Sequence, residues 1–146
     1  MWPIALEIAL FVLCDTQFAG KNVFGEGTLF SSVHHISINC SDAERDRDFY
    51  VSVLGFEQMS RPDLGFPGYW LRIGQQELHL LQVPNHQAPK GQHFAFHVED
   101  IDVARAHLMA SGVNVSDPRE ISGICRQCFF HDPSGNMLEL NQPLAG

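Results

Sequence analysis

The sequence has few basic residues. Lysine and arginine together number 9 against 17 aspartates and glutamates, which gives a formal net charge of -8 over 146 residues. A protein that binds a nucleic-acid backbone needs a surplus of cations to neutralise the phosphates, so we do not expect nucleic acid as a partner. With 45% hydrophobic and 18% charged residues, the composition is that of a folded, soluble protein with one core.

Long hydrophobic runs are also lacking. The apolar run from Trp2 to Cys14 is interrupted by Glu7 and falls short of the about 20 residues that a membrane-crossing helix needs. No basic residue precedes Lys21, whereas a secretory signal begins with basic residues. We therefore expect no membrane association, and we interpret residues 1–30 as an N-terminal extension of unknown role ahead of a domain at 31–146.

Cysteine is scarce, since the chain contains four, irregularly spaced. Secreted domains of small size often depend on a dense disulfide framework, so this scarcity indicates a reducing compartment and favours the cytoplasm. Cys125 and Cys128 form a C-x-x-C motif, but the chain continues into Phe129 and Phe130 as a strand. Redox-active pairs instead precede a helix, so we interpret these two cysteines as packing residues.

Histidine, in contrast, is abundant, with eight residues. Two of them begin matching segments, H-I-S-I-N-C-S-D from His35 and H-F-A-F-H-V-E-D from His93. Two later segments also match, because L-H-L-L-Q around His79 and L-E-L-N-Q around Glu139 share the frame L-x-L-x-Q. Such internal similarity predicts a chain built from two tandem modules.

Each module has the same predicted order of elements, βαβββ, and the modules cover about 33–83 and 92–142. Ser41 is the predicted cap of the first helix and Asp100 that of the second. The sequence therefore predicts an α+β fold made of two similar halves. The inner strands are predicted at 57–60 and 69–73 in the first module and at 114–116 and 125–130 in the second.

Four polar side chains occupy equivalent places on the first and last strands: His35, His79, His93 and Glu139. Polar groups flanked by leucines are at least half-buried, and burying them without partners is costly, so they satisfy one another or share an ion. Three imidazoles and a carboxylate suit one divalent ion of Zn, Ni, Co, Mn or Fe. Two competitors stay open, because His34 adjoins His35 and Glu77 shares the strand face of His79.

These motifs resemble those of the vicinal oxygen chelate superfamily, which includes glyoxalases, bleomycin resistance proteins and dioxygenases, and within it the glyoxalase I type. The resemblance covers about residues 33–142 and also includes D-P-S-G-N-M-L-E-L, which starts at Asp132. It implies that both modules form a cup around a metal, with His35, His79, His93 and Glu139 as ligands. In well-studied glyoxalase I enzymes the position of His79 is often Glu or Gln, so a histidine is a departure.

The same resemblance implies a metal-dependent lyase or isomerase like lactoylglutathione lyase. The metal would hold two vicinal oxygens of the substrate, and a proton would move through a metal-bound enediolate with Glu139 as the single catalytic base. A metal-dependent dioxygenase, a thiol transferase and a non-catalytic module that binds a drug or another small molecule are the alternatives. The predicted walls of the substrate site are aromatic: Phe66, Tyr69, Trp70 and Phe129.

The expected partners are a small-molecule substrate and a second copy of the chain. Superfamily members of this length often form homodimers, sometimes with each cup built from both chains. The ligand types alone do not select one metal. Possible anchors for an anionic substrate are Arg61, Arg72, Lys90 and Arg126.

Overall fold

The computed structural model describes residues 32–144, so the predicted extension at 1–30 lies outside the described residues. The first half contains β1 (His35–Cys40), α2 (Ala43–Ser52), β2 (Glu57–Met59), β3 (Gly68–Ile73) and β4 (Gln76–Gln82). The second half contains β5 (His93–His97), α3 (Ile101–Ala110), β6 (Arg119–Ile121), β7 (Cys125–His131) and β8 (Met137–Pro143). The predicted α+β fold with two βαβββ modules is confirmed. No helix in this described part is long and apolar enough to cross a membrane.

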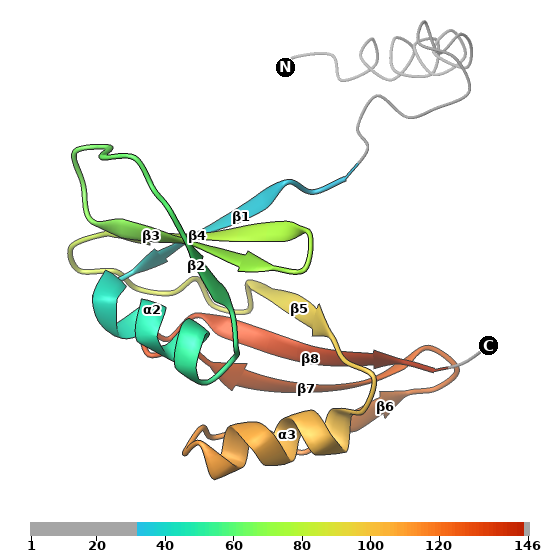
Figure 1. The fold of residues 1–146 in the computed structure, drawn as a ribbon. Helices are drawn as coiled ribbons and strands as arrows, with labels where there is room; N and C mark the ends of the chain where they lie inside the picture. The colour runs from blue at the N-terminus through green and yellow to red at the C-terminus, as the bar shows by residue number, and fades with distance from the viewer. Residues whose placement is uncertain (1–31, 145–146) are drawn as a thin grey trace, which may run out of the picture. The chain divides into compact units, whose positions relative to one another are not determined.

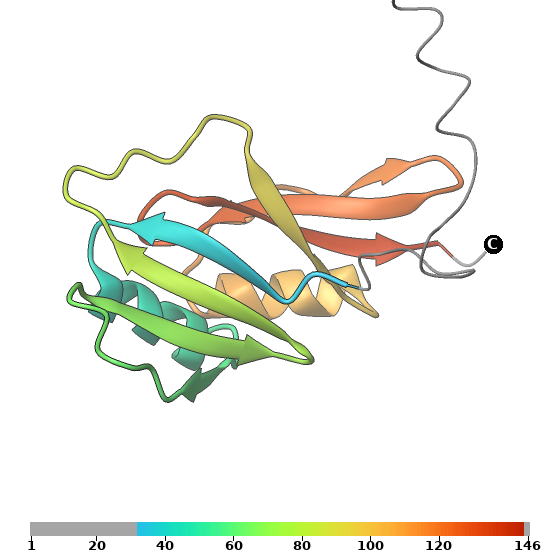
Figure 2. The same cartoon turned by 90° about the horizontal axis from the view of Figure 1, so that it is seen from above.

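Each module forms a four-stranded sheet with the same topology (Figures 1 and 2). The strand orders are β1-β4-β3-β2 and β5-β8-β7-β6. In both sheets the first and last strands of the module pair in parallel, and the remaining pairs are antiparallel. Helix α2 packs on the first sheet and α3 on the second, so each sheet has one face covered by its own helix.

Alternation along the last strands separates core residues from candidate site residues. Leu78 and Leu80 of β4 and Leu138 and Leu140 of β8 are buried in the hydrophobic core, on the helix side. Side chains one residue further along point to the opposite face. The second residue of each L-x-L-x-Q frame, His79 or Glu139, is therefore on the helix-free face of its sheet.

The glutamine that ends each frame joins the last strand to the helix. Gln82 Oε1 accepts a hydrogen bond from the backbone N–H of Ala43 at 3.0 Å, and Gln142 Oε1 accepts one from Ile101 at 3.2 Å. These N–H groups belong to the first residue of each helix and lack a partner within it. The repeated glutamine therefore has the same structural role in both modules.

The helix caps agree with the prediction in one module only. Asp100 caps α3, since its carboxylate accepts hydrogen bonds from the N–H groups two and three residues on. Helix α2 is capped in the same way by Asp42, so the prediction of Ser41 was wrong. The Ser41 hydroxyl instead lies 3.1 Å from the hydroxyl of Ser134 in the other module, and the adjacent aspartate provides the stronger capping acceptor.

The second strand of module two starts later than predicted. A strand at 114–116 was wrong, because β6 is Arg119–Ile121. Ser116 makes one backbone hydrogen bond to β7, of 2.9 Å, but Pro118 has no N–H with which to continue a ladder. After the proline, β6 pairs with β7, and a tight turn in which Gly123 has a φ of 70° connects the two strands.

A buried polar network joins the modules through the turn between β7 and β8. The Tyr50 hydroxyl of α2 donates to Asp132 at 3.0 Å. Asp132 also accepts hydrogen bonds from the backbone N–H of Ser134 and from the backbone N–H and the side-chain amide of Asn136. The Ser134 hydroxyl donates to Asp46 of α2 at 2.9 Å. Asp46 and Tyr50 are fully buried, and this burial raises the pKa of both groups.

Candidate metal centre

Three rings stack on the helix-free face of the first sheet. The imidazoles of His35 and His79 have centroids 4.3 Å apart and planes at 15°, and Trp70 stacks on His79 at 4.6 Å and 13°. The strand order β1-β4-β3 places His79 between the other two. His79 Nε2 lies 3.0 Å from Glu77 Oε2, and this hydrogen bond lowers the pKa of Glu77. The sheet therefore holds two imidazoles and one carboxylate in direct contact.

The competitors for the ligand positions are members of this cluster. Glu77 and His79 share a face and touch each other, so neither is remote from the candidate centre. His34 also belongs to it, because its Nδ1 lies 3.0 Å from Nδ1 of His35. The alternative ligand candidates, His34 and Glu77, therefore lie in the same small region of the first sheet as His35 and His79.

The second sheet holds a histidine–carboxylate pair on its helix-free face. His93 Nε2 lies 3.0 Å from Glu139 Oε2. His93 Nδ1 lies 3.0 Å from the backbone oxygen of Gly91, which can only accept, so Nδ1 carries the proton. Glu139 Oε1 accepts a hydrogen bond from Asn141 Nδ2 at 2.7 Å. Each member of the pair is thus fixed by an outer partner.

This arrangement fits a pair of metal ligands. With a proton on Nδ1, Nε2 is the ring nitrogen that can bind a cation, and it lies 3.0 Å from Oε2 of Glu139. Two electron-rich atoms at this separation attract each other only through a shared cation, a proton or a metal ion. A backbone carbonyl on Nδ1 and a donor on the carboxylate are the outer partners that metal-binding histidines and carboxylates commonly have.

Within the described residues, the two pairs of predicted ligands lie on separate sheets. Within residues 32–144, no group of three or more His, Cys, Asp and Glu side chains has the geometry to hold a metal. The aromatic and hydrogen-bond contacts of His35 and His79 involve the first sheet and the residue before it. Those of His93 and Glu139 involve the second sheet and the segment that enters it. One chain therefore presents two half-sites.

Two predicted wall residues lie beside the half-sites. Trp70 covers His79 in the stack described above. Phe129 of β7 is edge-on to His93, with centroids 5.3 Å apart and planes at 87°. Each half-site thus combines an imidazole with an aromatic ring from the strand that runs antiparallel to the last strand of the module.

The other two predicted wall residues lie elsewhere. Tyr69 packs against the hydrophobic core with the Arg47 guanidinium 4.7 Å from its ring, so it faces α2 rather than the ring stack. Phe66 precedes β3, is 41% exposed and lies 4.7 Å from the guanidinium of Arg61. The alternation of β3 separates Tyr69 from Trp70, which sequence position alone had grouped together.

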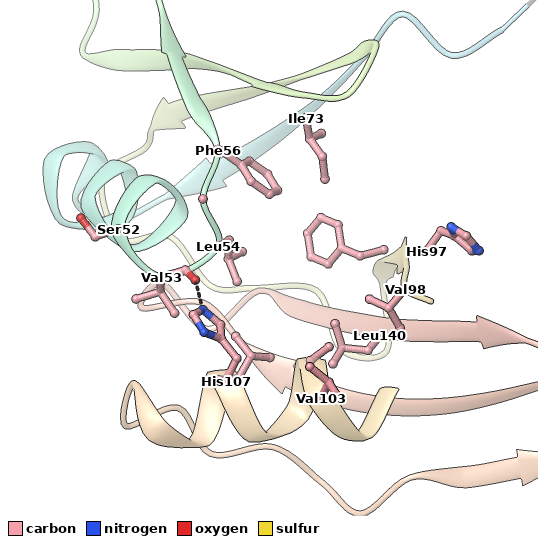
Figure 3. Close-up of a pocket in the computed structure, with 14 residues that line it drawn as sticks. Ser52, Val53, Leu54, Phe56, Ile73, His97, Val98, Val103, His107 and Leu140 are labelled. Carbon is pink, nitrogen blue, oxygen red and sulfur yellow. Dashed lines mark hydrogen bonds between the residues drawn. The ribbon is translucent and has the colours of Figure 1, made fainter. Parts of the chain in front are cut away.

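An apolar cavity of about 530 Å³ lies where the two modules meet (Figure 3). Its lining comes from the end of α2, from α3 and from the core side of the second sheet, and includes Phe56, Phe96 and Leu140. His107 also lines it, with Nε2 bonded to the backbone oxygen of Val53 at 2.8 Å. The four predicted ligands are not among the residues that line this cavity, so it is distinct from both half-sites.

The cysteine pair has the properties of packing residues. Cys125 and Cys128 are buried, unbridged and part of β7. Burial raises the pKa of Cys128, which opposes formation of a reactive thiolate. Cys125 accepts a weak contact of 3.5 Å from Asn141 Nδ2, so it supports the amide that holds Glu139.

The Glyoxalase/Bleomycin resistance protein/Dioxygenase superfamily model matches residues 32–140. The chain belongs to this superfamily, as the sequence motifs indicated, and proteins of this kind bind small molecules and typically a metal. Glyoxylase I 4 from Arabidopsis thaliana is 35% identical to it in an alignment of 131 positions that covers 82% of this chain and 75% of the relative.

Solved structures give the same relationship. A glyoxalase family protein from Enterococcus faecalis superposes with a TM-score of 0.70 and 31% identity, covering 78% of this chain and 99% of that one. TnmS3, an antibiotic binding protein from Streptomyces sp. CB03234, gives a TM-score of 0.67 and 29% identity, with coverage of 81% and 100%. The relatives thus include a protein named as a glyoxalase and one named as a binding protein.

Proposed function

We propose that the protein is a metal-dependent lyase or isomerase of the glyoxalase I type. One divalent ion of Zn, Ni, Co, Mn or Fe would be held by His35, His79, His93 and Glu139. The observation that carries the proposal is the His93–Glu139 pair, in which Nε2 and Oε2 lie 3.0 Å apart and both side chains are fixed by outer partners. The identity to Glyoxylase I 4 supports the reaction class.

Glu139 is the proposed catalytic base. Asn141 fixes Oε1, and Oε2, once it no longer binds the metal, would accept a proton from a carbon beside a carbonyl and return it to the neighbouring carbon. When bound, the metal would act as a Lewis acid that stabilises negative charge developing on substrate oxygen. Trp70 and Phe129 would shield the reacting carbon from water.

We also propose that the cup is completed by a second copy of the chain. The separation of the half-sites within residues 32–144 supports this arrangement. In a twofold dimer, the first sheet of one chain faces the second sheet of its partner, and the symmetry produces two identical cups. Each cup then receives His35 and His79 from one chain and His93 and Glu139 from the other.

The reaction is tested with methylglyoxal and glutathione, by following thioester formation after loading the protein with each of the five metals in turn. The proposal predicts turnover with at least one metal and none after chelation. Absence of thioester with every metal, in protein shown by elemental analysis to contain that metal, contradicts the glyoxalase assignment.

The shared cup is tested by mixing two inactive variants. His35→Ala with His79→Ala removes the first half-site, and His93→Ala with Glu139→Ala removes the second. Random exchange of subunits makes about half of the dimers heterodimers. Each heterodimer has one intact cup out of two, so activity returns to about a quarter of the wild-type value. If all four ligands of a cup came from one chain, the mixture would remain inactive.

A binding module without catalysis is the second candidate. The aromatic rings next to both half-sites favour it, as does the likeness to an antibiotic binding protein. Chelated protein titrated with bleomycin, followed by quenching of tryptophan fluorescence, distinguishes the two. Saturable binding without metal, together with no thioester formation, supports a binding module.

A further inference from the structure

Arg61, in the loop that joins β2 to β3, has an unsatisfied nitrogen. Its Nη2 atom is buried and has no hydrogen-bond partner within residues 32–144. Its Cζ lies 4.7 Å from the ring centre of Phe66, so the guanidinium is held against an aromatic face of the same loop. A buried cationic N–H without an acceptor raises the free energy of this resting arrangement.

The other arginines in this part of the chain are satisfied in other ways. Four make ion pairs with carboxylates: Arg45, Arg47, Arg105 and Arg126. Arg72 and Arg119 have exposed side chains that water can solvate. Among the arginines of residues 32–144, Arg61 alone combines a buried, unpaired nitrogen with the lack of a carboxylate partner.

The fold places this guanidinium close to the first half-site. A Cβ at Gly68 would lie 3.6 Å from Arg61 Cζ and would collide with the carbonyl oxygen of Leu80, so Arg61 packs where only glycine fits. Gly68 precedes Trp70 by two residues, roughly 7 Å along the strand, and Trp70 pairs with His79. The loop rises on the side of the first sheet opposite α2 (Figure 1), which is the side of the ring stack.

We propose that Arg61 binds an oxyanion of the substrate, a carboxylate or a phosphonate, at the edge of the cup beside Trp70. This inference rests on the proposed function for the reacting part of the substrate and adds its charge class. A guanidinium presents its N–H groups in a planar fork that matches two oxygens. Rotation of the flexible side chain brings Nη2 to that acceptor and relieves its unsatisfied state, so anionic substrates are favoured over neutral ones.

The test measures binding without turnover. Chelated protein is titrated with mercaptoacetate, mercaptomethylphosphonate and neutral mercaptoethanol, followed by ligand-observed NMR. We expect both anions to bind more tightly than mercaptoethanol, and the tighter of the two identifies the substrate oxyanion. Arg61→Met should weaken anion binding about 10- to 100-fold, to the level of mercaptoethanol, whereas Arg119→Gln, an exposed arginine in module two, should leave it unchanged.

Thermal unfolding shows whether Arg61→Met is folded. If it is not, Arg61→Lys replaces it in the test, because lysine keeps the charge and most of the aliphatic chain. It should retain an intermediate affinity, because it loses the two-pronged geometry. Anion binding that is the same in wild type and in both variants, or wild-type protein that binds mercaptoethanol as tightly as the anions, overturns the inference. Anion binding that depends on Arg61 without any thioester formation would refute the lyase reaction and leave the anion site intact.

Discussion

Modules one and two share a sheet topology, an aspartate cap and a helix-binding glutamine, yet they hold their equivalent ligand positions differently. In module two, a backbone carbonyl fixes His93 and the amide of Asn141 fixes Glu139. In module one, His79 is packed between two aromatic rings. The residue two places beyond His79 is Leu81, at the position where module two has Asn141.

This difference indicates how the duplicated unit divided its tasks. The elements that build the sheet and join it to the helix are the same in both halves, because both need the same fold. The side chains on the helix-free faces differ, since one face orients a carboxylate by a hydrogen bond and the other stacks rings. A proton-transfer site needs one well-oriented carboxylate, and the carboxylate that the second sheet orients, Glu139, is the proposed base.

The largest expected effect separates the two carboxylates. Glu139→Gln should lower the turnover number by about 100- to 10,000-fold with metal still bound, because the amide cannot accept the proton. The matched variant Glu77→Gln should leave the turnover of fully loaded protein within about tenfold of wild type. Steady-state kinetics with parallel elemental analysis measure both, and equal losses in the two variants would mean that module two does not hold the base alone.

The next effect concerns the turns that precede the last strands. Asp132 accepts four hydrogen bonds at the module junction, whereas the corresponding turn of module one, at Gly74 and Gln75, makes no such network among the described residues. Asp132→Ala should lower the free energy of unfolding by about 3 kcal/mol, because the buried Tyr50 hydroxyl and the turn N–H groups lose their acceptor. Gln75→Ala is the control and should change it by less than about 0.5 kcal/mol. Urea unfolding measures both, and similar losses would remove the asymmetry between the turns.

Much of the fold could be predicted because the repeat fixes several elements at once. The frame L-x-L-x-Q sets the alternation of β4 and β8, and with it the faces on which His79 and Glu139 lie. The errors arose where a local pattern competed with a contact from elsewhere. Ser41 matches the sequence pattern of a helix N-cap, but its hydroxyl is hydrogen-bonded to Ser134 in a turn of the other module.

The candidate site was less predictable than the fold. Sequence spacing grouped Tyr69 with Trp70, although alternation places them on opposite faces, and this signal was available in the sequence. Asn141 could also have been found, since it lies two residues beyond Glu139 on the same face. The separation of the half-sites and the buried nitrogen of Arg61 depend on how distant segments pack, which no local pattern contains.

A smaller effect should follow from making module two resemble module one. Asn141→Leu installs the residue that module one has at the equivalent position and removes the hydrogen bond to Glu139. Outer partners of this kind are typically worth 10- to 100-fold in metal affinity, so the dissociation constant should rise by about that factor. Calorimetric metal titration measures it, with Leu81→Ala as the control in module one. An unchanged affinity would show that the amide does not orient the carboxylate.

The smallest effect is a pH dependence that comes from a buried helix carboxylate of module one, which has no counterpart at the equivalent position of module two. Asp46 is buried at the junction, whereas the equivalent residue of α3 is Ala104. Burial raises the pKa of Asp46 above its ordinary value of 3.8, so the folded state keeps this proton to a higher pH than the unfolded state. Its contribution to stability therefore falls as pH rises through that window and is constant above it.

Asp46→Asn removes the titration while keeping the side-chain shape. The stability of wild type minus that of the variant should decrease as pH rises from about 4 and then level off. Urea unfolding at a series of pH values measures this difference, with Asp48→Asn, an exposed carboxylate on the same helix, as the control. A difference that increases with pH would mean that hydrogen bonds from Arg45 and Ser134 outweigh burial, and that the junction stabilises the charged form of Asp46.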